Sequence, residues 1–210
     1  MFDMDGVLFD SMPYHAIAWH RTFLEYGFDI PPSALYLHEG RTGKSTVQIL
    51  LGEKEASRWQ EYYSRKVRHF QSFPPPSAMT GALASVRAVR TCGCSAIVVT
   101  GSSQKGLLER LERDFSGLFS AVVSSSDVVY GKPSPEPYLL GLSRMGVQPC
   151  DAMVVENAPL GVESGHAAGC FVAAVNTGPL PDRSLLDAGA DVLFHSMEEL
   201  SQAIPDLLSR

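Results

Sequence analysis

Hydrophobic residues along the chain follow one pattern before residue 77 and another after it. In the first part they recur at helical spacing, and the stripe of Ala16 and Trp19 predicts a helix over residues 11–26. Further helices are predicted over residues 46–51 and 53–70. The proline cluster at residues 73–77 ends this helical part and suits a domain boundary.

After the proline cluster, short apolar runs alternate with amphipathic segments. The apolar runs predict strands over residues 95–100, 121–124, 152–155, 171–175 and 191–194. The segments between and around them predict helices over residues 81–91, 105–114, 136–145, 160–168 and 197–208. Such alternation is typical of a parallel sheet with helices on both faces. We therefore predict a doubly wound α/β core built from residues 1–11 and 78–210, with an inserted helical cap domain over residues 12–77.

Composition narrows the class of protein. The chain has 210 residues, is 45% hydrophobic and 19% charged, and carries a net charge of −6, which favours a globular protein with a real core. The acidic balance and the lack of a dense basic run argue against nucleic acid as a partner. No apolar run reaches the length of a membrane span, so we expect no membrane partner and a cytoplasmic protein. Four cysteines without zinc-ligand spacing are expected to be reduced thiols.

The N-terminal segment carries the first candidate chemistry. Asp3 and Asp5 alternate with apolar residues, and Gly6 follows at once. At the end of a strand, residues two apart point to the same side, so both carboxylates would share one target. Gly6 allows a sharp exit from the strand and a close approach of the backbone to a ligand. Because Asp-Gly is also a common turn dipeptide, the segment alone favours an ordinary strand-to-turn transition.

Polar residues at four strand ends and loops change that interpretation. They are Asp3-x-Asp5, Thr100-Gly101-Ser102-Ser103, Gly131-Lys132-Pro133 and Glu156-Asn157. In parallel sheets, ligands bind outside the carboxyl ends of the strands. The set offers carboxylates, hydroxyls, main-chain N–H groups and a lysine, which is what phosphoryl transfer requires. One carboxylate can attack phosphorus, a second can move protons, and oxygen ligands can hold Mg²⁺.

A loop in the predicted cap has two interpretations. The run from His38 to Ser45 is denser in polar groups than a linker requires. It is either a solvated turn before a helix capped near Thr42 or Ser45, or a loop that presents Arg41 and Lys44 to a phosphoryl anion. The residues alone do not separate these two interpretations.

Together the four ordered motifs resemble those of the haloacid dehalogenase superfamily, and the helical insert resembles the cap of its β-phosphoglucomutase-like subgroup. The resemblance covers essentially the whole chain. It implies that Asp3 is the nucleophile and a Mg²⁺ ligand, and that Asp5 is the general acid/base with its main-chain carbonyl on the metal. It further implies a phosphoryl site made by Thr100, Gly101, Ser102 and Lys132, and a metal site completed by Glu156 and Asn157.

Within the subgroup, residues 11–15, 38–43 and 156–162 most resemble the inorganic pyrophosphatase branch. That likeness makes His15 and Glu39 candidate cap-side residues of the active site. Asn157 departs from the aspartate usual in the superfamily, so it keeps one oxygen ligand for Mg²⁺ but removes a negative charge. This departure is expected either to suit a more anionic substrate, to weaken metal binding, or to be neutral drift.

Three functions follow from these observations. The leading expectation is a Mg²⁺-dependent hydrolase of inorganic pyrophosphate, with Arg41 and Lys44 on the cap side of the substrate. The alternative is a β-phosphoglucomutase or a small sugar-phosphate phosphatase, and a third is a silent phosphate-binding module. We expect a monomer. Because only two residues precede Asp3, we also expect the true start upstream or a truncated chain, and greater stability with an apolar N-terminal extension.

Overall fold

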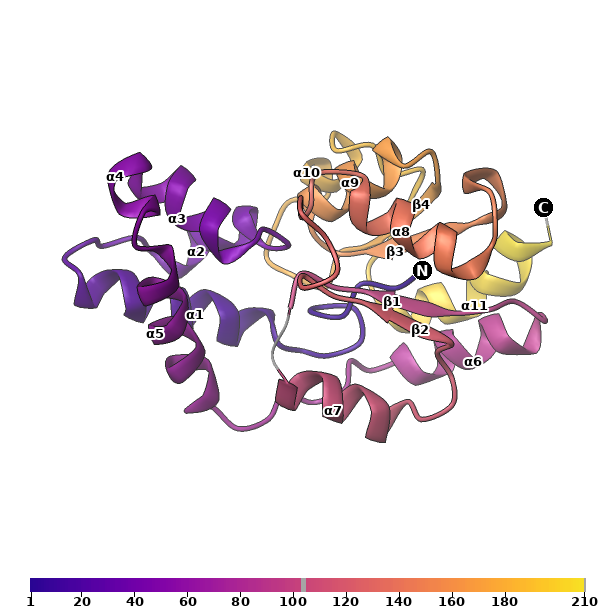
Figure 1. Ribbon diagram of the computed structural model, residues 1–210. Helices are drawn as coiled ribbons and strands as arrows, with labels where there is room; N and C mark the ends of the chain where they lie inside the picture. Colours follow the sequence, from indigo (N-terminus) through magenta and orange to yellow (C-terminus); the bar gives the residue numbers. More distant parts are fainter. Residues whose placement is uncertain (103–104, 210) are drawn as a thin grey trace.

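The computed structural model describes residues 1–102 and 105–209, and Ser103 of the second motif lies outside them. The fold has an α/β core and a helical cap that projects from one end of it (Figure 1). This is the fold class that the sequence predicts. The exact domain boundaries at residues 11/12 and 77/78 stay a prediction.

The cap consists of short helices around its own apolar centre. They are α1 (Met12–Glu25), α2 (Pro32–Leu35), the 3₁₀ helix η1 (Tyr36–His38), α3 (Gly43–Leu51), α4 (Glu53–Ala56) and α5 (Trp59–Gln71). Ala16, Trp19, Phe23, Leu35, Val47 and Tyr62 are buried between them. The single helix predicted over residues 53–70 is wrong, because the chain turns at residues 57–58 and forms two helices.

The core sheet is parallel and has the N-terminal segment at its centre. Its strands are β1 (Ile97–Val99), β2 (Ala121–Val123), β3 (Met153–Glu156), β4 (Phe171–Val175) and β5 (Val192–Phe194). β1 pairs with β2, and β3, β4 and β5 pair in that order. Phe2 joins the two groups, since it forms parallel bridges to Val98 of β1 and Val155 of β3. Asp3 therefore directly follows the central position of the sheet.

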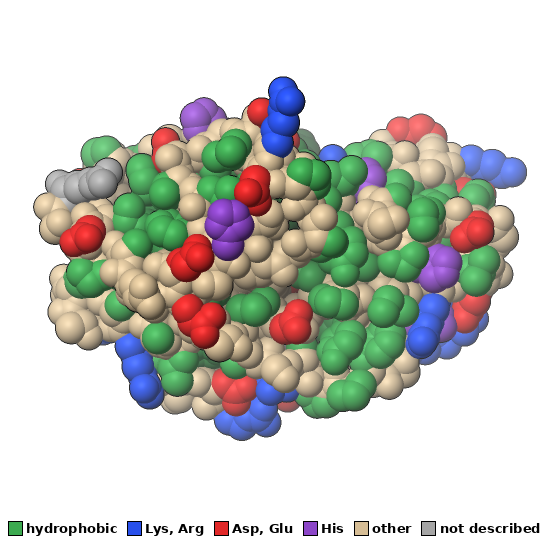
Figure 2. Space-filling model, turned by 180° about the vertical axis from the view of Figure 1, so that it is seen from behind, with side chains coloured by type: hydrophobic (Ala, Val, Ile, Leu, Met, Phe, Trp, Pro, Cys, Tyr) green, Lys and Arg blue, Asp and Glu red, His purple; other side chains and the backbone are tan. Residues whose placement is uncertain are grey.

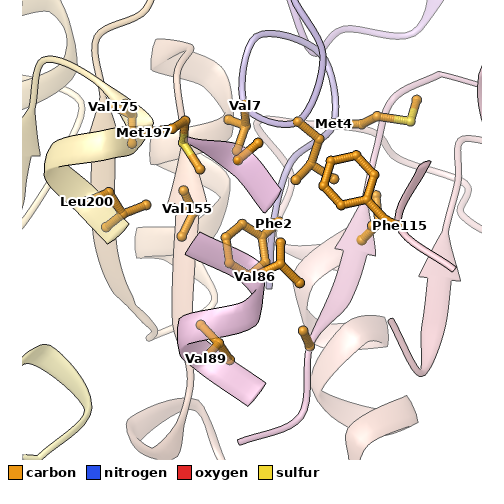
Figure 3. Close-up of a cluster of buried hydrophobic side chains, with 14 of the residues drawn as sticks. Phe2, Met4, Val7, Val86, Val89, Phe115, Val155, Val175, Met197 and Leu200 are labelled. Carbon is orange, nitrogen blue, oxygen red and sulfur yellow. The ribbon is translucent and has the colours of Figure 1, made fainter. Parts of the chain in front are cut away.

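Helices cover both faces of the sheet. They are α6 (Ala82–Thr91), α7 (Lys105–Asp114), α8 (Glu136–Met145), the 3₁₀ helix η2 (Pro149–Asp151), α9 (Pro159–Ala167), α10 (Asp182–Leu186) and α11 (Met197–Leu208). One apolar cluster lies beneath α6, α7 and α11, where Phe2 packs among Val86, Val155 and Leu200 (Figure 3). A second cluster lies beneath α8, α9 and α10. The central segment is thus held from both faces.

The distribution of charged side chains on the surface agrees with the lack of a dense basic run in the sequence. On the face shown in Figure 2, lysine and arginine side chains lie in separate groups among acidic and apolar ones. Over the part of the chain that the structure describes, no helix combines the length and apolarity needed to cross a bilayer. The four cysteines are free thiols.

Candidate active site

The predicted site residues meet between the carboxyl ends of the strands and the cap. Gly6 has φ +83°, so the chain leaves the central segment through a backbone conformation that favours glycine. A side chain on Gly6 would overlap the amide group of Asn157, so the backbone lies close to this side chain, and its close approach to a ligand stays a prediction. Core and cap enclose a cavity of about 60 Å³. Its lining includes Asp3, Asp5, His15, His38, Glu39, Arg41, Tyr63, Lys66, Gly101, Ser102, Lys132, Glu156 and Asn157.

Lys132 links the first and last motifs. Its ammonium donates to Asp3 Oδ1 at 2.5 Å, to Glu156 Oε1 at 2.6 Å and to the Val99 carbonyl at 3.0 Å. Although burial alone would lower the pKa of Lys132, Asp3 and Glu156 outweigh it and raise that pKa. Lys132 therefore stays charged beside the predicted nucleophile, where a cation stabilises a transferring phosphoryl group.

The Glu156 carboxylate is fully engaged by protein groups. Besides Lys132, Tyr138 donates its hydroxyl to Glu156 Oε1 at 2.7 Å, and the main-chain N–H of Asn157 donates to Oε2 at 3.1 Å. Burial, followed by Glu156, raises the pKa of Tyr138 well above 10, so this phenol stays a donor. The structure thus uses Glu156 to hold Lys132, and its direct ligation of a metal stays a prediction.

Asp5 belongs to a second network, which reaches into the cap. Ser11 donates to Asp5 Oδ1 at 2.6 Å, and His15 Nε2 lies 3.1 Å from the same oxygen. On the other side of the imidazole, Lys66 Nζ lies 2.6 Å from His15 Nδ1. A lysine ammonium can only donate, so Nδ1 accepts and the proton of neutral His15 is on Nε2, directed at Asp5. Ser11 is the N-cap residue of α1, but its side chain makes no cap bond and donates to Asp5 instead.

The pKa values follow from burial and these contacts. Burial alone would raise the pKa of Asp5, but His15, Ser11 and Lys66 together lower it. Burial and the charge of Lys66 lower the pKa of His15 and keep it neutral. Burial, with Glu156 and Asp5 nearby, raises the pKa of Asp3 to about 8 against the opposing effect of Lys132. The two aspartates are thus placed in different environments, as different roles in one reaction require.

The cap contributes two further titratable groups to the cavity, Glu39 and Lys66. Burial, with Asp5 and Asp3 nearby, raises the pKa of Glu39 to about 8, while burial lowers that of Lys66 to about 8. Arg41 Nε and His38 Nδ1 are buried and have no hydrogen-bond partner within residues 1–102 and 105–209. Buried polar atoms usually have partners, so these orphan atoms point to a ligand in the cavity.

Glycines let the cap loop lie directly on the core. A Cβ on Gly101 would lie 3.0 Å from the carbonyl oxygen of Gly40, and one on Gly131 would lie 2.8 Å from Thr42 Cγ2. Both distances are tighter than ordinary contacts, so the absence of side chains permits this closed arrangement. Gly101, predicted to bind substrate, also supports closure.

The oxygen donors at this end of the sheet fit Mg²⁺. Asn157 is 5% exposed, and neither its Oδ1 nor its Nδ2 has a partner in the part of the chain that the structure describes. A buried carbonyl oxygen without a donor is available to a hard cation, as are the carboxylate of Asp3 and the main-chain carbonyl of Asp5. No cluster of three or more His, Cys, Asp or Glu side chains suited to a metal occurs in the described ranges. The candidate ligands include an amide oxygen in place of a third carboxylate. The asparagine at position 157, where the superfamily usually has aspartate, is therefore compatible with a metal.

Two predicted residues lie outside the cavity. Lys44 is exposed near the start of α3 and is absent from the lining, where Gly43 and Thr46 face the cavity instead. Thr100 is buried behind the lining, and its hydroxyl accepts from the main-chain N–H of Ser102 at 2.9 Å. Thr100 therefore shapes the loop. Lys44 does not line the cavity, and its contact with substrate stays a prediction. Thr42 does cap α3, as one of the two interpretations of the loop predicted.

Several groups of the site were missed by sequence reasoning. They are Ser11 as a partner of Asp5, Lys66, Tyr138, and the aromatic wall of Trp19 and Tyr63. Lys66 belongs to a helix whose charge pattern indicates exposure, yet it is 4% exposed. Its burial depends on the docking of α5 against α1, which no local pattern shows.

Comparisons with known proteins identify the family. Residues 1–175 match the haloacid dehalogenase-like hydrolases. The chain belongs to this family. Among solved structures it is similar to "Putative beta-phosphoglucomutase from Bacteroides vulgatus", with a TM-score of 0.93 and 44% identity, covering 100% of this chain and 89% of that one. This similarity places the dehalogenase-like chain in the β-phosphoglucomutase-like subgroup, as the motifs indicated.

Curated relatives of this dehalogenase-like hydrolase include sugar-phosphate phosphatases. Hexitol phosphatase A of Escherichia coli is 31% identical over 205 residues, covering 96% of this chain and 92% of the relative. The phosphorylated carbohydrates phosphatase of Thermotoga maritima is 31% identical over 222 residues, covering 99% of this chain and 98% of the relative. These relatives support a phosphatase and favour the sugar-phosphate alternative over the leading expectation of pyrophosphate.

Proposed function

We propose that this protein is a Mg²⁺-dependent phosphatase of small phosphorylated sugars or polyols that works through an aspartyl-phosphate on Asp3. The observation that carries the proposal is the pair of networks in one cavity. Lys132 contacts the nucleophile, while Ser11 and His15 hold Asp5 at a separate position. Family membership supports the reaction class, and the named relatives support the substrate class.

The first half of the reaction phosphorylates the enzyme. A carboxylate oxygen of Asp3 attacks phosphorus, and the bond from phosphorus to the leaving oxygen breaks. Asp5 donates a proton to that oxygen, so the sugar leaves as an alcohol. Asp5 must then be protonated when substrate binds, and the approach of the anionic phosphoryl group favours this state because like charge raises the pKa of a carboxyl group.

The second half releases phosphate. Asp5, now ionised, takes a proton from water, and the resulting hydroxide attacks phosphorus of the aspartyl-phosphate. The phosphorus–oxygen bond to Asp3 breaks, inorganic phosphate leaves, and Asp5 is protonated again. Ser11 and His15 both bond Oδ1 of Asp5, so the other oxygen is the one left for this proton transfer.

A metal ion is part of the proposal. Asp3 and Asn157, with the main-chain carbonyl of Asp5, would hold Mg²⁺. The ion supplies positive charge that favours ionised Asp3 and offsets the charge of the phosphoryl group. Lys132 and Ser102 bind the phosphoryl group from the protein side, and the Ser102 hydroxyl, which has no partner among the described residues, is available for that contact.

Pyrophosphate is the second candidate substrate. The closed cavity of about 60 Å³ has room for on the order of four to six waters, which suits a compact anion. Arg41 on the cap would meet its second phosphoryl group. A hexose phosphate requires the cap loop to move away from Gly101 and Gly131.

A substrate panel separates these candidates. Initial rates with Mg²⁺ are compared for hexitol phosphates, hexose phosphates, fructose 1-phosphate and pyrophosphate, and repeated with a chelator. We expect kcat/KM for a sugar or polyol phosphate to exceed that for pyrophosphate by at least about tenfold, with no turnover in chelator. Preference for pyrophosphate would establish the second candidate. Formation of glucose 6-phosphate from β-glucose 1-phosphate and a bisphosphate primer would reveal a mutase, and retained activity in Asp3→Asn would reject the nucleophile.

A further inference from the structure

Tyr138 of α8 is a buried side chain whose polar group reaches the site from behind. It is fully buried in the apolar cluster beneath α8, next to β1 and β3. Its hydroxyl donates to Glu156 Oε1 at 2.7 Å, and its ring lies 5.1 Å from the ammonium of Lys132. One aromatic side chain therefore contacts both members of the Lys132–Glu156 pair without lining the cavity.

The position of the Lys132 ammonium depends on its attraction to two carboxylates. Its ammonium lies 2.5 Å from Asp3 and 2.6 Å from Glu156. Glu156 Oε1 accepts from Lys132 and Tyr138 at once, so the phenol offsets part of the charge that draws Lys132 toward Glu156. The ring of Tyr138, 5.1 Å from the ammonium, occupies one further side of it. Without the hydroxyl, the ammonium is drawn toward Glu156 and away from Asp3.

We propose that Tyr138 is a positioning residue, which fixes how Lys132 is shared between Glu156 and the reacting groups at Asp3. This inference rests on the proposed phosphatase function and adds to it a residue that does not touch substrate. Lys132 at the right place stabilises the transferring phosphoryl group most in the transition state. Loss of the Tyr138 hydroxyl therefore affects kcat more than KM.

The test compares Tyr138→Phe with Tyr62→Phe. Tyr62 is a matched control, since it is 1% exposed and its hydroxyl donates to a carboxylate, Glu55 Oε2, at 2.6 Å, but inside the cap. We expect Tyr138→Phe to lower kcat by about tenfold with KM within about twofold, as for loss of a hydrogen bond to a charged group. We also expect the inhibition constant of orthovanadate to rise by the same factor, whereas the Kd of inorganic phosphate does not change. Tyr62→Phe lowers melting temperature comparably and leaves kcat within about twofold.

A double-mutant cycle gives a second test, with kcat expressed per folded protein so that poor folding of Tyr138→Phe does not mimic a loss of turnover. If Tyr138 acts through Glu156, then Tyr138→Phe in a Glu156→Gln background costs less than about twofold in kcat. Additive losses, equal effects of the two Tyr→Phe variants, or an unchanged kcat would overturn the inference. A wild-type protein without phosphatase activity would instead reject the proposed function, so the two failures are distinguishable.

Discussion

Replacing Lys66 with methionine separates stability from activity at this site. Lys66 is 4% exposed, and its ammonium lies 2.6 Å from His15 Nδ1. Burial lowers its pKa from 10.5 to about 8, a difference that corresponds to about 3 kcal/mol against the charged form at neutral pH. Methionine removes this free-energy cost of burying a charge and retains most of the apolar stem of the side chain.

Two losses oppose the gain. The ammonium lies 5.3 Å from the ring of Phe70 and 5.8 Å from that of Trp19, contacts worth about 1 kcal/mol together. The hydrogen bond to His15 contributes about 1 kcal/mol more. The net expectation is a gain of about 1 kcal/mol, or a melting temperature about 2–4 °C above the wild type in a chain of this length.

Activity is expected to change in the opposite direction. Without the donor at Nδ1, His15 no longer has a fixed tautomer that directs Nε2–H at Asp5. We expect kcat for a sugar phosphate to fall by about 10- to 100-fold, the effect typical of a lost orienting partner. p-Nitrophenyl phosphate, whose leaving group needs no proton, loses less.

Thermal unfolding and steady-state kinetics at pH 7 check both expectations. Lys54→Met is the control, because Lys54 is exposed on α4 and is not among the residues that line the cavity. A kcat within twofold of wild type, or a melting temperature more than about 5 °C lower, would refute the reasoning. So would equal losses with both substrates, because a general-acid role requires a difference between them.

Three further predictions follow from the site. Asn157→Asp restores a carboxylate at the candidate metal position and should lower the Mg²⁺ concentration for half-maximal activity by about tenfold, measured by metal titration; an unchanged value would exclude Asn157 as a ligand. Gly161→Ala places a methyl group on the Glu156 carboxylate, so kcat should fall by at least about 100-fold, and near-normal turnover would contradict the role of the Lys132–Glu156 pair. Because the pKa values of Asp3 and Glu39 are raised to about 8, the folded protein keeps protons that the unfolded chain releases between about pH 4 and pH 8. Metal-free stability should therefore fall as pH rises through that window, and Mg²⁺ should offset the fall at pH 8; urea unfolding at several pH values checks the sign, and a rise in metal-free stability would contradict it.

Much of the core and of its half of the site could be predicted from sequence. The four motifs end apolar strands, and the parallel topology brings strand ends together whatever the details of packing. Helices at residues 105–114, 136–145 and 197–208 have the predicted bounds because amphipathic periodicity and end signals agree there. The five-residue helix α10 was missed, since so short a segment shows no period.

The cap half of the site was less predictable. Glu39 and His15 were identified only through family resemblance, and Lys66 was missed because the docking of α5 on α1 decides its burial. A loop sequence also does not show which side chains of the following helix face inward, and Lys44 lies outside the cavity lining. Nor does a sequence show that Glu156 accepts from Lys132 and Tyr138, which depends on contacts between three separate elements.

Rapid-quench mass spectrometry tests the central claim most directly. The protein is mixed with a sugar phosphate and Mg²⁺, quenched in acid within the first turnover, and digested with pepsin. The account predicts that the N-terminal peptide gains the mass of one phosphoryl group on Asp3, and that the gain is absent in Asp3→Asn. Turnover with no phosphorylated Asp3 at any quench time, or a phosphoryl group on another residue, would contradict it.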